Sequence, residues 1–184
     1  MSIRIPSIIE GHDGRDCFWI QPVKCHSTTV FDHDEVEENI TAEISLDEET
    51  VFAFLKFFFN KFFDNTLVYN QRLETNCGNV QFAEFDWNLT HNFYTRKAFH
   101  QMLQEISDVA EQLKAHGLSA VPNEIAKDFW LCDDERPKMS MQEKMALVES
   151  NVSIIVDFYQ RFVNRMNRML DENPDWPLIS IMGP

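Results

Sequence analysis

Residues 141–171 read MQEKMALVESNVSIIVDFYQRFVNRMNRMLD, and this stretch decides the expected fold. Apolar side chains recur along it at alternating steps of four and three residues: Met141, Met145, Val148, Val152, Ile155, Tyr159, Phe162, Met166 and Met169. An average step of about 3.5 residues places these side chains in one stripe on one helix. The spacing therefore predicts a single long C-terminal helix, against which the rest of the chain packs.

A second, Phe-rich helix is predicted upstream of it. Ser45 and Glu48 have the spacing of a capping box, and the apolar pattern continues to about Asp64. Phe58 and Phe62 lie on the densest apolar seam of this segment, so we expect both side chains to be almost fully buried.

The remaining pattern is of short strands and helices. Alternation and turn residues predict strands at 3–9, 17–23 and 36–44, a hairpin of 67–73 with 80–89, a helix from Thr95 to His116 closed by Gly117, and a short helix within 122–130. Pro6 and Pro22 lack a backbone donor, which favours edge strands. Because strands mostly neighbour strands in this order, we expect an α+β fold. It is an antiparallel sheet of about five strands, packed on one face by three main helices, with a long C-terminal helix.

The length favours one domain spanning residues 1–184. We expect an N-terminal sheet region at 1–90, a helical region at 91–172 and a short C-terminal tail at 173–184. The hydrophobic content of 44%, with 16 Phe and 4 Trp, suffices for a real core.

Acidic residues dominate the charge. The 30 Asp and Glu outnumber the 16 Lys and Arg, which gives a formal net charge of −14. Such a surface repels phosphate backbones, so we expect no nucleic-acid binding. The charge serves solubility, or it steers a basic protein partner toward the chain.

Targeting signals are not evident in the sequence. We find no signal peptide and no run of about 20 apolar residues, so we expect a soluble, cytoplasmic protein without membrane contact. In that compartment Cys17, Cys25, Cys77 and Cys132 are expected as reduced thiols.

Histidine and acidic residues crowd the N-terminal region. They are His12, Asp13, Asp16, Cys17, Cys25, His26, Asp32, His33, Asp34 and Glu35. A transition metal needs three or four such ligands that converge, yet no His-x-x-x-His or Cys-x-x-Cys pair occurs. We interpret these residues as polar loop positions and predict neither a metal site nor a cofactor.

Arg161, Arg165 and Arg168 form a basic stripe on the predicted long helix. Guanidinium groups suit phosphate and carboxylate recognition because they bind in a bidentate way. Asp157 and Glu172 each lie four residues from an arginine and can pair with it. Arg165 lacks such an acid, so it is predicted either to reach a carboxylate on another element or to bind an anion.

The junction between the hairpin and the next helix is the candidate ligand site. It contains Trp87, His91, Tyr94, Arg96 and His100, to which we add Arg165 as a possible anion-binding residue. Helix N-termini present free N–H groups to anions. Arg96 in the first turn opposes the helix dipole, so an acid or an anion is expected near it. The alternative is a packed aromatic junction with Trp87 in the core.

No catalytic signature stands out. The sequence contains no Gly-x-Ser-x-Gly elbow, no reactive Cys/His context and no Gly-rich phosphate loop. We therefore expect a non-enzymatic interaction or regulatory protein that binds a basic protein partner, of the inhibitor or immunity type for example. The alternative is a small-ligand or metal-dependent enzyme with its site at the junction 87–100. A homodimer through an exposed end of the long helix is also considered.

Overall fold

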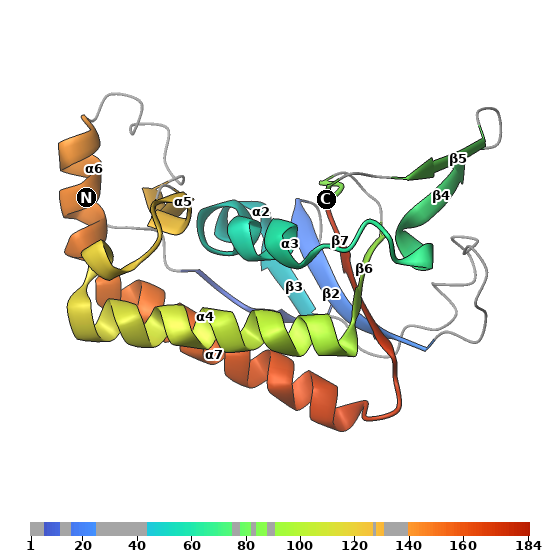
Figure 1. The fold of residues 1–184 in the computed structure, drawn as a ribbon. Helices are drawn as coiled ribbons and strands as arrows, with labels where there is room; N and C mark the ends of the chain where they lie inside the picture. The colour runs from blue at the N-terminus through green and yellow to red at the C-terminus, as the bar shows by residue number, and fades with distance from the viewer. Residues whose placement is uncertain are drawn as a thin grey trace.

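The computed structural model describes residues 6–11, 16–24, 44–74, 78–81, 84–87, 91–126, 128–130 and 140–184. Five strands form an antiparallel sheet in the order β1 (Ile9–Glu10), β3 (Ile44–Asp47), β2 (Cys17–Val23), β7 (Leu178–Met182) and β6 (His91–Thr95). The predicted hairpin forms as β4 (Gln71–Glu74) and β5 (Gly78–Gln81), but as a separate two-stranded sheet that projects from the main one (Figure 1).

In chain order the helical elements are α2 (Glu48–Thr50), the π-helix η1 (Val51–Leu55), α3 (Lys56–Phe62), α4 (Arg96–His116), α5 (Asn123–Ala126), α6 (Met141–Glu149) and α7 (Val152–Glu172), with short 3-10 turns η2 (Val68–Asn70), η3 (Leu118–Ala120) and η4 (Asp128–Trp130). The helices α4 and α7 and the Phe-rich segment around residues 48–62 lie on one face of the main sheet (Figure 1). Figure 1 shows α4 and α7 side by side along the sheet. Within the described ranges, no helix combines the length and hydropathy needed to cross a membrane. The expected α+β class, with a five-stranded antiparallel sheet and a long C-terminal helix, is therefore confirmed.

The core lies between this sheet face and the helices. Successive strand residues point to opposite faces, and alternate residues such as Phe18, Ile20 and Tyr94 join one large apolar cluster with the helices. The α7 stripe supplies its other half, because Ile155, Tyr159, Phe162, Met166 and Met169 are all fully buried.

The predicted long helix is divided in two. Asn151 turns the chain: its N–H bonds to the carbonyl of Val148 at 2.9 Å, and its side-chain Nδ2 donates to the carbonyl of Leu147 at 2.8 Å. A side chain that bonds locally to the backbone competes with helix continuation, so α6 ends at Glu149 and α7 starts at Val152. Met145, predicted in the stripe, is 37% exposed as a result.

The predicted closure of α4 by Gly117 is confirmed, whereas the predicted N-terminal cap of the Phe-rich helix is wrong. Thr95 Oγ1 accepts the N–H of Ala98 at 3.1 Å, and Gly117 closes α4 with a φ of 69°. Ser45, by contrast, lies within β3. Because β3 continues to Asp47, that residue is the N-cap and accepts the N–H of Thr50 at 2.9 Å.

Strands β6 and β7 of the sheet were not predicted. Residues 91–95, assigned to the start of the helical region, form β6. Residues 178–182, assigned to a tail, form β7 and pair with both β2 and β6. Pro22 therefore lies in a central strand, opposite Ile179. The prediction that Pro22 marks an edge strand is therefore wrong, because β2 pairs with β3 on one side and with β7 on the other. The predicted strand segment 36–43 lies outside the described residues.

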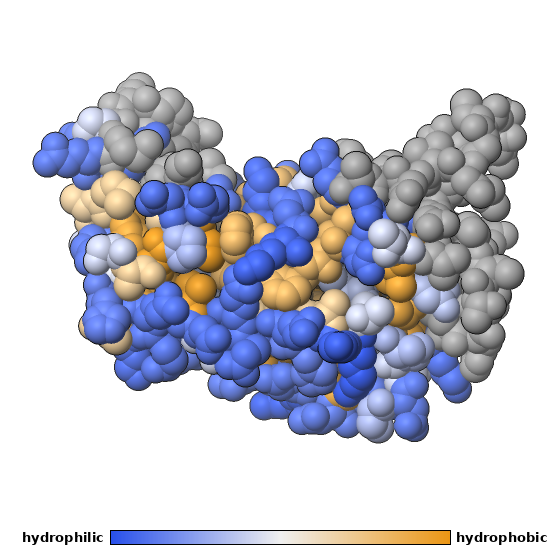
Figure 2. Space-filling model, in the orientation of Figure 1, coloured by the Kyte–Doolittle hydropathy of each residue, from blue (hydrophilic) through white to orange (hydrophobic). Residues whose placement is uncertain are grey.

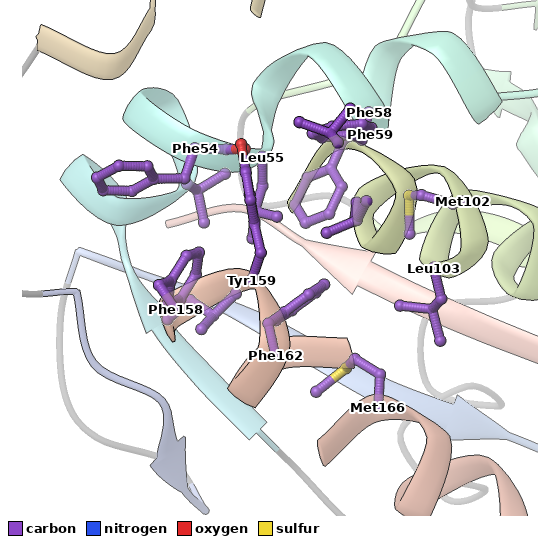
Figure 3. Close-up of a cluster of buried hydrophobic side chains, with 14 of the residues drawn as sticks. Phe54, Leu55, Phe58, Phe59, Met102, Leu103, Phe158, Tyr159, Phe162 and Met166 are labelled. Atoms are coloured by element: carbon purple, nitrogen blue, oxygen red, sulfur yellow. The ribbon is translucent and has the colours of Figure 1, made fainter. Parts of the chain in front are cut away.

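The Phe-rich segment is fastened by two buried tyrosines. Tyr159 Oη donates to the carbonyl of Phe54 at 2.7 Å, and Tyr94 Oη donates to that of Phe59 at 2.7 Å. Burial raises the pKa of both tyrosine hydroxyls, so they remain protonated donors. Figure 3 shows Tyr159 reaching from α7 toward the helix that carries Phe54, beside Phe158 and Phe162.

The π-helix changes which phenylalanines are buried. Its i→i+5 pattern widens the turn and shifts later residues around the helix axis. Phe58 is fully buried, as predicted, and so is Phe59. The expectation for Phe62 is wrong, because this side chain packs only partly buried at the rim of the core.

Replacing Phe58 by Ala should lower the free energy of unfolding by about 3–5 kcal/mol, since it removes a fully buried ring and leaves a cavity. Phe62→Ala is the matched control and should cost clearly less. Urea denaturation of both variants measures the difference. Equal losses would mean that the π-helix does not set the register of this segment.

Candidate functional site

The second face of the sheet, turned away from the helices, is unusually polar for buried surface. Its residues alternate with those of the core, and they include Trp19, Gln21, Ser45, Ser180 and His91, each at most 5% exposed. Apolar neighbours on this face are Val23, Phe93 and Leu178, on which Leu67 and Tyr69 pack. The polar groups are thus set among aromatic and aliphatic side chains.

Three of these residues, Gln21, Ser180 and His91, lie on three adjacent strands, and we call them the polar row. Gln21 of β2 is opposite Ser180 of β7, which is in turn opposite Phe93 of β6. His91 precedes Phe93 by one pleat, and its Nδ1 lies 2.6 Å from Ser180 Oγ, within hydrogen-bond distance. The His91 ring stacks on that of Phe93, with centroids 5.8 Å apart, which fixes its orientation.

The side-chain amide of Gln21 is the anomaly of the polar row. It is 1% exposed, and among the described residues neither its oxygen nor its nitrogen has a hydrogen-bond partner. A buried polar group without a partner costs about 1–3 kcal/mol. The side-chain amide of Gln21 therefore lowers the stability of the folded protein at this position.

The Ser180–His91 pair resembles a nucleophile beside its base, but its burial argues for another role. Ser180 is 0% exposed and sits in the middle of a central strand. A substrate carbonyl could not approach its hydroxyl without separating the sheet from what covers it. We interpret the hydrogen bond as a cross-strand tie between β7 and β6.

Trp87 belongs to an aromatic cluster on the helix side of the sheet. Its ring lies 5.7 Å from Phe18, 5.1 Å from Phe52 and 4.3 Å from Phe85, centroid to centroid. A Cβ at Gly183 would overlap the carbonyl of Trp87, so glycine is what lets the two backbones approach. This environment matches the packed aromatic junction that the sequence allowed.

The other junction residues do not converge. His91 and Tyr94 lie three positions apart on one strand, so their side chains point to opposite faces. Tyr94 donates into the core, while His100 is exposed on α4. The structure thus places the predicted ligand residues in separate surroundings.

Arg96 stabilises the end of another helix. Its guanidinium donates to the carbonyls of Leu170 at 2.5 Å, Asn173 at 2.8 Å and Trp176 at 3.5 Å. The last carbonyls of a helix lack intrahelical partners and carry partial negative charge. Arg96, which is unfavourable in the first turn of α4, therefore caps the C-terminal end of α7. The backbone carbonyls there supply the negative partial charge that was expected from an acid or an anion.

Arg165 reaches a carboxylate on another element, as one of its two predicted alternatives stated. Its Nε and Nη2 lie 2.5 and 2.6 Å from the two carboxylate oxygens of Glu10 in β1. Arg161 bonds Asp157 at 2.8 Å and the carbonyl of Pro6 at 3.3 Å. The basic stripe thus holds the segment around β1 onto α7.

Most of the N-terminal histidine and acid cluster lies outside the described residues, and only Asp16 and Cys17 of it are described. Within the described part of the chain, no three His, Cys, Asp or Glu side chains gather as a metal ion would require.

Sequence reasoning missed Gln21 and Ser180. Both interrupt apolar strands, since Gln21 follows Phe18-Trp-Ile and Ser180 lies between Ile179 and Ile181. A single polar residue inside such a run is the signal that could have identified them. No protein-family model, curated protein or solved structure matches this chain.

Arg165 holds the pKa of the Glu10 carboxyl below its usual range, chiefly by hydrogen bonding. The folded pKa is lowered, so the pair stabilises the protein at neutral pH and loses that effect as the pH falls through the folded pKa. Because Glu10 is 65% exposed, Glu10→Gln should cost only about 0–1 kcal/mol near pH 7, and the cost should shrink progressively as the pH is lowered below the ordinary carboxyl range. Urea denaturation over a series of pH values from neutral to acidic checks this, with the exposed Glu111→Gln as control. A loss independent of pH would exclude a charge effect.

Replacing Gln21 by Met should raise the free energy of unfolding by about 1 kcal/mol. Methionine has a similar volume, and the exchange removes an amide that has no described partner. Thermal and urea denaturation measure the gain, with Gln104→Met on the exposed face of α4 as a control for the exchange itself. A destabilised Gln21→Met would show that a water molecule or another group satisfies the amide in solution.

Proposed function

We propose that this chain is a cytoplasmic, non-enzymatic interaction or regulatory protein that binds a basic protein partner through its acidic surface. The observation that carries the proposal is the net charge of −14 on 184 residues. An inhibitor or immunity protein that neutralises a basic target is the type that fits this charge, because complementary potentials accelerate encounter and exclude acidic partners.

The use of the cations within the fold supports the proposal. The described Arg96, Arg161, Arg165 and Lys61 all bind groups of this same chain, Lys61 at 2.6 Å from Glu105. Cations engaged in this way are poorly placed to attract an acidic partner. Other exposed cations, such as Lys97, Lys114 and Arg168, remain available, but exposed carboxylates outnumber exposed cations among the described residues.

The exposed carboxylates are spread over several elements. Those among the described residues are Glu10, Asp16, Glu49, Asp64, Glu84, Asp108, Glu111, Glu124, Glu143, Glu149, Asp157, Asp171, Glu172 and Asp175. Figure 2 shows hydrophilic side chains covering the edge formed by α4 and α7, with apolar ones gathered above, over α2–α3. Such a distribution favours long-range attraction of a basic partner over a single charged pocket.

The enzyme alternative has less support. It needs several of the junction residues in one place, and His91, Tyr94, Arg96, His100 and Arg165 lie in separate surroundings with separate partners. Only His91 lies beside other buried polar side chains, and those are neutral. We therefore prefer the interaction role.

The test is the salt dependence of association with a partner isolated by affinity capture. Raising salt from about 0.01 M to about 0.15 M shortens the screening length from about 30 Å to about 8 Å. The association rate should fall by roughly tenfold or more. Stopped-flow mixing measures this rate.

A double substitution on α4 sharpens the test. Asp108→Asn with Glu111→Gln removes two exposed charges and should slow association at low salt, whereas Gln101→Asn with Gln112→Asn on the same helix should not. If the association rate changes neither with salt concentration nor with the double substitution, the carboxylates do not steer a partner and serve solubility alone.

A further inference from the structure

We draw no further inference here: the strongest candidate, the side-chain amide of Gln21 buried in the polar row on the second face of the sheet, belongs to the candidate site already described, and nothing in the described part of the chain shows which ligand or partner would bind it.

Discussion

Two tyrosine hydroxyl groups buried in the core fix the position of the Phe-rich helical segment relative to the sheet and α7. Tyr94 rises from the sheet and Tyr159 from α7, and each ends on a backbone carbonyl of that segment. A buried hydroxyl without an acceptor costs several kcal/mol in apolar surroundings, roughly 2–7 by transfer data. The segment therefore cannot slide by one residue without losing both bonds. Packing of phenylalanines alone would tolerate such a shift far more easily.

Much of the architecture could be predicted because its signals are local. The apolar stripe of α7 and the Thr95 and Gly117 caps of α4 depend on residues within a few positions of one another. The failures depend on contacts between distant positions. Ser45 has the spacing of a cap, but β3 pairs it with residues far along the chain. Leu178–Met182 is too short to be distinguished from a tail until β2 and β6 are seen to flank it.

The difference between local signals and contacts of distant residues also explains which features of the candidate site could be predicted. Arg96 was correctly identified as a cation in the wrong place for its own helix. The reason is the end of α7, which arrives 74–80 residues later in the chain. Arg165 was predicted either to reach a carboxylate on another element or to bind an anion, and only the fold could show that the carboxylate is that of Glu10. The polar row could not be predicted because its members come from three strands, one of which was assigned to a tail.

The position of β7 has a consequence for how the molecule assembles. This strand follows all the other described strands in the chain, yet it lies between β2 and β6, so among the described strands it alone joins β6 to the sheet. The pairing of β2, near residue 20, is complete only when β7, near residue 180, has been added beside it. Contacts between such distant residues slow folding, because the chain loses the entropy of closing a long loop before the strand pairing can stabilise it. On a ribosome, the helices could form and associate early, while β2 and β6 remain apart. The sheet would then close only after β7, which follows β2 and β6 in the chain, has been synthesised.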